Sequence, residues 1–177
     1  MASKIKVDQI QTADGTGTIA LQNQLSGMTT ASLPTVTTDK LGAGAIIQVR
    51  ESSATSTVTV NSGTETDVIT LNITPSSSSN AILIMTYGHS GHLGGGGTGR
   101  FEHRIRRDST FVIKTYTERN SSDKFKASAD SMTVLDFPNT TSQITYKLTS
   151  QRTMGSDTSS YGGSSTYYGI TLMEVKQ

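Results

Sequence analysis

The sequence predicts an all-β protein in which an N-terminal extended arm with a β-hairpin precedes an antiparallel jelly-roll sandwich. Composition is the first indication: 24 Ser and 29 Thr stand among 177 residues, and these residue types favour half-exposed strands and turns. The second is a series of nine short apolar or alternating segments, bounded by turn residues, after residue 44. The third is that few stretches rich in Leu, Ala, Glu or Lys remain from which a helix could form.

The pattern of residues 1–43 predicts an N-terminal arm and a linker rather than a globular domain. Two short apolar segments flank the turn sequence DGTG at 14–17, and this pattern indicates a hairpin. Because an isolated two-stranded hairpin is marginally stable in water, we expect the arm to lie against a partner surface or against copies of itself. Residues 26–44 are expected to form an extended connector, with a disordered tail as the alternative. The candidate anchoring residues are Ile5, Val7, Ile10, Ile19 and Leu21.

Residues 44–177 are expected to form the sandwich, organised around AILIMTY at 81–87. This is the longest apolar run, and its length and β-branched residues predict a strand buried on both faces. Three long loops are expected at 88–99, 118–131 and 150–166. The predicted strands are 45–50, 57–60, 67–73, 81–87, 100–107, 110–117, 132–137, 143–149 and 167–175.

Charge and cysteine content exclude several classes of function. The chain has 15 basic and 14 acidic residues, so no long-range field steers it to nucleic acid. The absence of cysteine excludes disulfides, thiolate metal sites and thiol nucleophiles. We expect a chain made in the cytoplasm without membrane insertion, because no stretch approaches the roughly 20 apolar residues of a transmembrane helix and no secretory signal is visible. A hydrophobic content of 33% favours self-association.

The residues that could take part in metal binding or catalysis can also be explained without such a role. His89 and His92, in HSGH, and the later His103 could supply imidazoles to a metal on a trimer axis, or face solvent from a loop. The glycine run at 94–97 matches no phosphate-binding motif, and the serines lack a G-x-S-x-G context. We therefore assign no catalytic residue, no cofactor and no metal, and we expect no enzymatic activity.

Two further groups are candidates for contacts. The basic stretch RFEHRIRRD at 100–108 is expected to form a strand face whose arginines pair with acidic neighbours or with another subunit. It lacks the interleaved exposed aromatic residues of a nucleic-acid reader. Tyr161, Tyr167 and Tyr168 stand in or near a Gly/Ser-rich loop, which suits an adaptable recognition surface. The alternative places Tyr167 or Tyr168 at the core edge of the last strand.

Two parts of the sequence resemble known proteins. The opening, SKIKVDQIQTADGTGTIAL at 3–21, is similar to N-terminal segments of many phage virion proteins, particularly tail-fibre proteins of marine and cyanobacterial phages. The remainder resembles a C-terminal domain that often follows such openings. The shared segments are GAIIQV at 44–49, DVITLNITPSSSSNAILIM at 67–85, RRDST at 106–110, SMTVLDFPNTTSQITYKL at 131–148 and ITLMEV at 170–175.

The resemblance implies a homotrimeric virion protein with a head similar in outline to tumour-necrosis-factor-like domains. Its arm is expected to anchor the trimer to other virion proteins, either of the tail or of the major capsid. One interpretation is a tail fibre or spike whose loops contact a host surface glycan or protein. The other is a capsid decoration (cement) protein. The use of this opening in tail-fibre genes favours the first, and the short stretch before the head favours the second.

If the protein is a tail fibre or spike, residues in or beside the predicted loops are expected to contact the host receptor. A carbohydrate-binding module is a third class of function, for which the sequence shows no aromatic platform. The candidate receptor-contact residues are His89, His92, Arg100, Tyr161 and Tyr167.

Overall fold

The chain divides into two compact units, Met1–Lys40 and Leu41–Gln177. The computed structural model describes residues 10–11, 18–19, 37–93, 98–119, 125–129, 131–162 and 166–177.

The first unit contains the predicted hairpin. β1 (Ile10–Gln11) pairs antiparallel with β2 (Thr18–Ile19), and Ile10 lies opposite Ile19. A short 3₁₀ helix, η1 (Thr38–Lys40), follows in the same unit. Most of the predicted connector lies outside the described residues, as do the candidate anchoring residues Ile5, Val7 and Leu21.

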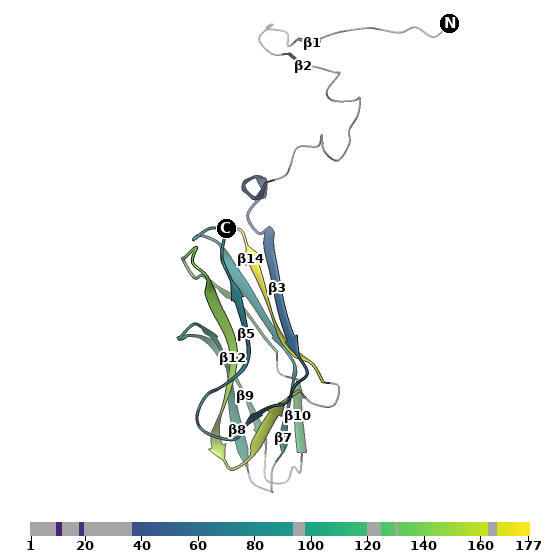
Figure 1. Cartoon of the computed structure of the whole chain (residues 1–177), viewed down its shortest axis with the longest axis vertical. Coiled ribbons are helices and arrows are strands. Elements are labelled where there is room, and N and C mark those ends of the chain that lie inside the picture. Colours follow the sequence, from purple (N-terminus) through teal and green to yellow (C-terminus); the bar gives the residue numbers. More distant parts are fainter. Residues whose placement is uncertain are drawn as a thin grey trace, which may run out of the picture. The chain divides into compact units, whose positions relative to one another are not determined.

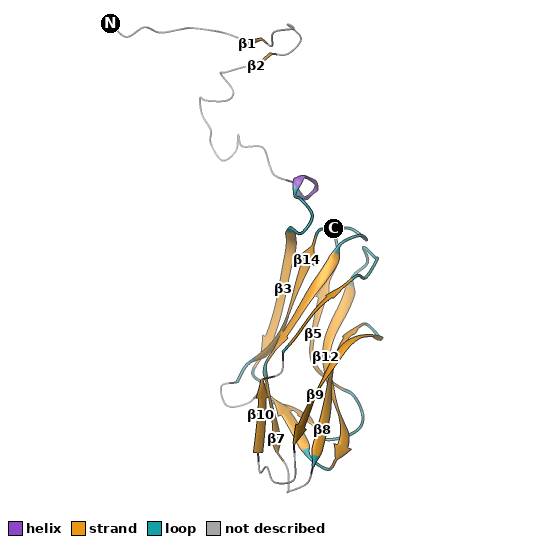
Figure 2. Ribbon diagram, turned by 180° about the vertical axis from the view of Figure 1, so that it is seen from behind, coloured by secondary structure: helices purple, strands orange, loops and turns teal. Residues whose placement is uncertain are grey.

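The second unit, called the head below, consists of strands in its described part. Figures 1 and 2 show these strands running along the length of the head, with β7 and β10 at the end away from the C-terminus. The strands are β3 (Ile46–Ala54), β4 (Val58–Val60), β5 (Thr66–Ile73), β6 (Ala81–Tyr87), β7 (His89–Leu93), β8 (Gly99–Arg107), β9 (Thr110–Arg119), β10 (Phe125–Ala129), β11 (Met132–Asp136), β12 (Ile144–Gly155), β13 (Thr158–Tyr161) and β14 (Tyr168–Val175).

The strands form three antiparallel four-stranded sheets. We call them the β6 sheet (order β11-β6-β14-β3), the β8 sheet (β5-β12-β8-β9) and the β13 sheet (β10-β7-β13-β4). Among these pairs, only β8 and β9 are consecutive along the chain, and they form the predicted hairpin. The other connections pass from one sheet to another, which is the connectivity of a jelly roll. The all-β jelly-roll prediction is therefore confirmed.

The core lies between the β6 and β8 sheets. Ile84 and Leu172 from the first sheet belong to one cluster of buried side chains with Ile105 and Leu148 from the second. The predicted alternation along β8 holds in that Phe101, His103 and Ile105 are fully buried and Arg104 is half-buried, but Glu102 departs from it because it is also buried. Tyr168 is also buried in this cluster, at the core edge of the last strand, as the alternative for that residue predicted.

β6 lies inside its sheet, but the prediction that both of its faces are buried is wrong. Ile82, Ile84 and Thr86 are buried, whereas Met85 is 39% exposed and Tyr87 is exposed to a similar extent. The physical reason is that a two-layer sandwich covers only one face of each sheet. An apolar run can therefore fill an outward face as well as an inward one.

The prediction of three long loops is also wrong, because each of these segments contains strand residues. β7 and β10 lie within the first two predicted loops, and the end of β12 with all of β13 lies within the third. These segments are rich in Gly and Ser and poor in the side chains that favour strands, so the pattern does not mark them. Backbone pairing within the β13 sheet holds them, for example with Ser160 opposite Gly91.

A buried carboxylate fastens the last strand to the connection between β5 and β6. Glu174 is fully buried, and its Oε1 accepts hydrogen bonds from the Ser76 backbone N–H, the Ser76 hydroxyl and Asn80 Nδ2, each at 2.7 Å. Its Oε2 accepts a fourth from Gln48 Nε2 at 3.2 Å. Burial opposes ionisation of Glu174, but these bonds outweigh it and hold the pKa below the ordinary value.

A second carboxylate joins three segments at the β8–β9 turn. Asp136 Oδ2 accepts hydrogen bonds from Arg107 Nη1 at 2.8 Å and from the Tyr146 hydroxyl at 2.6 Å. Asp108, which follows Arg107 in the β8–β9 turn, adopts a φ of 51°. Its Oδ1 accepts a hydrogen bond from the Thr145 backbone N–H at 3.0 Å. The side-chain contacts of this cluster therefore depend on residues from RRDST, SMTVLDF and ITYKL.

Replacing Glu174 by Ala should lower the free energy of unfolding by about 3 kcal/mol, because buried donors lose their acceptor. Urea unfolding of the full chain measures this change. The matched control is Glu51→Ala, which removes an exposed carboxylate that accepts the Tyr87 hydroxyl at 2.6 Å; it should cost less than about 1 kcal/mol. Equal losses in the two variants would contradict the special role of the buried group.

The head should lose stability in acid. The hydrogen bond from Arg106, with help from Thr149 and the charge of Arg104, lowers the pKa of Glu65 from 4.5 to about 2. A carboxylate with a pKa lowered on folding stabilises the fold above its unfolded pKa and loses that contribution as the pH falls. The free energy of unfolding should therefore decrease between pH 4.5 and about 2. Glu65→Gln should show a shallower decrease, and an unchanged slope would refute this assignment.

Candidate self-association surface

The outer face of the β6 sheet carries a row of apolar side chains across all four strands. The pairing register places Met173 between Val49 and Leu83, and Leu83 beside Leu135. Val49 is 56% exposed and Leu135 is also exposed, while the two inner members of the row are half-buried. The row arises because β3, β6, β11 and β14 each place an apolar residue at the same outward register position.

Two adjacent rows extend this face. In the next row Met85 lies beside Thr171, and in the following row Tyr87 lies beside Gly169. A Cβ on Gly169 would come within 2.4 Å of the Tyr87 ring, so glycine leaves the space that the ring occupies. The Tyr87 hydroxyl donates to Glu51 Oε1 at 2.6 Å, and this bond, together with burial, raises the pKa of Tyr87. The ring therefore lies across the sheet and adds apolar area to it.

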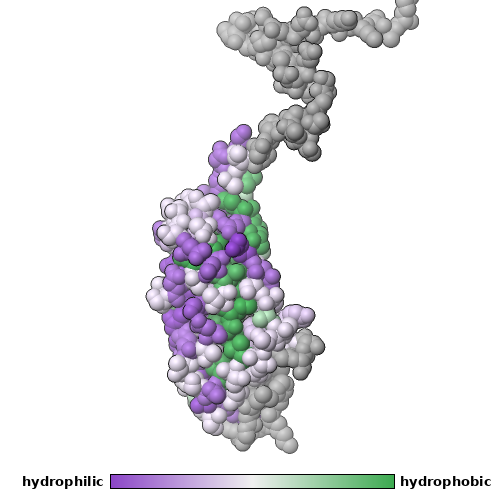
Figure 3. Space-filling view, in the orientation of Figure 1, coloured by the Kyte–Doolittle hydropathy of each residue, from purple (hydrophilic) through white to green (hydrophobic). Residues whose placement is uncertain are grey.

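The apolar face continues toward the strand ends nearer the C-terminus. Ile46 at the start of β3 and Phe137 just after β11 are both exposed. Figure 3 views the edge of the sandwich, and the upper part of its green hydrophobic band lies where Figure 1 places β3, the edge strand of the β6 sheet. Contiguous apolar surfaces of this kind, rimmed by polar residues, are typical of protein–protein contacts. We call this face, comprising Ile46, Val49, Leu83, Met85, Tyr87, Leu135, Phe137 and Met173, the apolar face.

The apolar face is suited to binding rather than to a reaction, since its side chains carry no nucleophile apart from the tyrosine hydroxyl held by Glu51. Within the described residues there is no group of three or more His, Cys, Asp or Glu side chains placed to hold a metal ion. A search of the same residues finds no helix with the length and hydropathy of a membrane span.

The structure separates the candidate receptor-contact residues. His89 is exposed on β7, and Tyr167, just before β14, is 65% exposed. Arg100 on β8 is half-buried, and its guanidinium lies 4.0 Å from the centroid of the Tyr116 ring. His92 is a β7 residue whose side chain lies outside the described part of the structure. These residues belong to two different sheets and to the connection before β14.

Tyr161 requires a correction, because it is a core residue rather than a loop contact. Its side chain on β13 is fully buried, and its hydroxyl is hydrogen-bonded to His103 Nδ1. The two rings pack edge-on with centroids 5.6 Å apart, and His103 Nε2 lies 2.8 Å from the Thr117 hydroxyl. His103 is likewise fully buried and is not positioned beside His89 to share a metal on the surface. Both side chains pack in the interior between the β8 and β13 sheets.

Comparison with known proteins gives structural likeness only. No family model and no curated protein matches the chain. The chain is similar to dimeric latent PorU from Porphyromonas gingivalis, at 10% identity and a TM-score of 0.41, over 76% of this chain and 14% of that one. It is also similar to the VP2 subviral particle of infectious bursal disease virus, at 12% identity and a TM-score of 0.40, over 75% and 34%.

A structure of the Gx strain of infectious bursal disease virus is similar at 10% identity and a TM-score of 0.40, over 75% of this chain and 33% of that one. The chain thus spans about a third or less of the length of these proteins. Similarity at this level does not indicate a function.

The double variant Val49→Asp/Leu135→Asp should abolish self-association of the full chain, because it places a charge at each edge of the apolar row. Light scattering coupled to size-exclusion chromatography measures the mass, and circular dichroism checks that the head is folded. The matched control is Thr70→Asp, which places a charge at an exposed position of the β8 sheet. An assembly that survives in the double variant, or is lost equally in the control, would contradict the assignment.

Proposed function

We propose that the protein is a non-enzymatic virion structural protein whose heads assemble as a homotrimer through the apolar face and whose arm anchors to the particle. The observation that carries the proposal is the apolar row across the β6 sheet, which a single chain leaves in water. Burying it between copies would remove a large apolar area from solvent, at roughly 25 cal/mol per Å². In a homotrimer one part of the apolar face on each chain meets a different part of that face on the next chain, and a threefold rotation closes the ring.

The start of the head is hydrogen-bonded to the end of its last strand. The Gly44 N–H donates to the Lys176 carbonyl at 2.7 Å, the Lys176 N–H donates to the Ala45 carbonyl at 2.9 Å, and Lys176 Nζ donates to the Leu41 carbonyl at 2.6 Å. These bonds join residues 41–45, at the start of the head, to the residue that follows β14.

The resemblance of the sequence to phage virion proteins supports the particle as the location. The opening segment is similar to tail-fibre proteins, so we place the chain in a tail fibre or spike that contacts the host surface. The shared segments of the head belong to the clusters around Glu174 and Asp136, and they therefore support a common fold rather than a common receptor. Host recognition is proposed for the surfaces outside those clusters.

The number of copies of this chain per purified virion tests the particle location. Quantitative mass spectrometry against the major coat protein should find a few trimers per particle, as expected for a tail appendage. A ratio near one copy per coat subunit, or a simple fraction of it, would contradict the tail assignment and indicate a capsid decoration protein.

Deleting residues 1–25 should leave a folded head that is no longer incorporated into particles. The described strands of the head pair among themselves in three sheets, so we expect the head to fold without the arm. Thermal unfolding of the truncated chain measures folding, and immunoblotting of purified virions measures incorporation. Incorporation at the level of the full chain would refute the anchoring role.

A further inference from the structure

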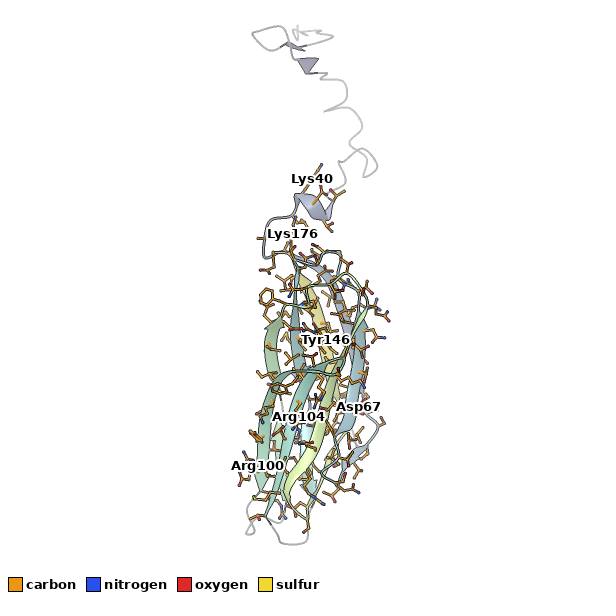
Figure 4. All side chains as sticks on the ribbon, turned by 90° about the vertical axis from the view of Figure 1, so that its left-hand side faces the viewer. Lys40, Asp67, Arg100, Arg104, Tyr146 and Lys176 are labelled. Carbon is orange, nitrogen blue, oxygen red and sulfur yellow. The ribbon has the colours of Figure 1, made fainter. Side chains whose placement is uncertain are left out.

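The outer face of the β8 sheet contains an open hollow that the proposed assembly does not use. Figure 4 looks onto this side of the head, where Arg100 and Arg104 are labelled. The hollow has a volume of about 240 Å³ and is lined by Glu102, Arg104, Arg106, Phe111 and Lys114. The lining combines three cations, one carboxylate and one aromatic ring.

A β-bulge places the aromatic ring in the hollow. Ile105 lies opposite Ile113, but the next residue, Arg106, lies opposite Phe111, so Val112 is an extra residue on β9. In an unbroken strand Phe111 and Lys114, three residues apart, would point to opposite faces. The bulge brings both side chains to the outer face, where Phe111 is 49% exposed.

Cations exceed carboxylates in and beside the hollow. Glu65 Oε2 accepts hydrogen bonds from Arg104 Nη1 at 2.9 Å and from Arg106 Nη2 at 2.6 Å. Glu102 Oε2 accepts one from Lys114 Nζ at 3.1 Å, and Glu102 also pairs with Arg104. Three cations thus face two carboxylates, which leaves one positive charge in excess. The paired guanidinium groups are held in fixed positions, so the site is preorganised for an anionic group.

A second exposed ring lies beside the hollow on the same strand. Tyr116 is 41% exposed, stands opposite Glu102 and packs under the Arg100 guanidinium. Lys114 Nζ lies 5.2 Å from the centroid of this ring, so the lysine stands between two aromatic side chains. Two aromatic side chains of β9, Phe111 and Tyr116, are therefore exposed in and beside the hollow.

We propose that this hollow binds an acidic saccharide, meaning a sugar that carries a carboxylate or a sulfate ester. The anionic group pairs with Lys114, whose Nζ donates one hydrogen bond of 3.1 Å to Glu102, and the apolar side of a sugar ring packs on Phe111. Arg106 is already held by Glu65 and by the Ser109 carbonyl, so it contributes positive charge to the hollow rather than a direct bond. A neutral sugar would leave the excess positive charge unpaired. A nucleic-acid backbone fits less well, because two fixed carboxylates stand among the cations and the net charge of the chain is only +1.

This inference does not depend on the virion proposal. The β8 sheet and the β6 sheet are the two opposed layers of the sandwich, so the hollow and the apolar face lie on opposite sides of the head. Burial of the apolar face between copies leaves the hollow open. Binding can therefore be tested separately from assembly and from particle location.

Isothermal titration of the full chain with trigalacturonic acid, and with a chondroitin sulfate tetrasaccharide, tests the proposal. We expect saturable binding of at least one probe, and at least about tenfold weaker binding of the methyl ester of trigalacturonic acid if the free acid binds. Phe111→Ala and Lys114→Ala should each raise the Kd about fivefold or more. The matched control, Met154→Ala, removes an exposed apolar side chain outside the hollow and should leave the Kd unchanged.

Absence of saturable binding by both probes overturns the proposal. So does wild-type affinity in the Phe111→Ala and Lys114→Ala variants, provided that their melting temperatures match that of the wild type. Equal affinity for the free acid and its methyl ester would show that charge plays no part, which also refutes it. Tighter binding of a single-stranded decathymidylate, lost in Lys114→Ala, would identify nucleic acid as the ligand instead.

Discussion

The full hydrogen bonding of buried carboxylates is the constraint on which this sandwich depends. Glu174 has four hydrogen bonds, and Asp157 is paired with Arg119 through two bonds of 2.7 Å with both side chains fully buried. An unpaired charge in either place would cost several kcal/mol. Because the donors come from distant segments, the sheets can close only in one register. Gly99 lies so close to Asp157 that a Cβ there would approach its carboxylate to 2.3 Å.

The two layers of the head carry opposite kinds of outer surface. The β6 sheet presents apolar side chains, whereas the β8 sheet presents paired charges around Glu65 and Glu102. A surface of paired ions is stable in water, and an apolar face such as that around Val49 gains free energy when it is covered. The fold thus separates an apolar side, for which we propose association with copies, from a charged side, for which we propose a small ligand. This division follows from which residues occupy the outward register positions, not from the topology itself.

Strong local patterns in the sequence predicted most of the fold but only part of the candidate sites. The alternation in β8 and the apolar run of β6 located those strands, because burial of one face imposes a period of two. The same pattern could not tell an outward apolar row from a core, since Leu83 and Met85 look like interior residues in either case. β7 and β13 were missed because backbone pairing alone defines Gly- and Ser-rich strands. Phe111 was missed because a bulge changes the face to which its side chain points.

The mass of the full chain in dilute solution tests the central claim most directly, namely that the apolar face is buried between copies. Sedimentation equilibrium over a range of micromolar concentrations should give three times the chain mass of 18.8 kDa. A particle of that mass agrees with a homotrimer closed around the β6 sheet. A monomer of 18.8 kDa at every concentration would contradict the account, because the apolar row would then remain exposed to water.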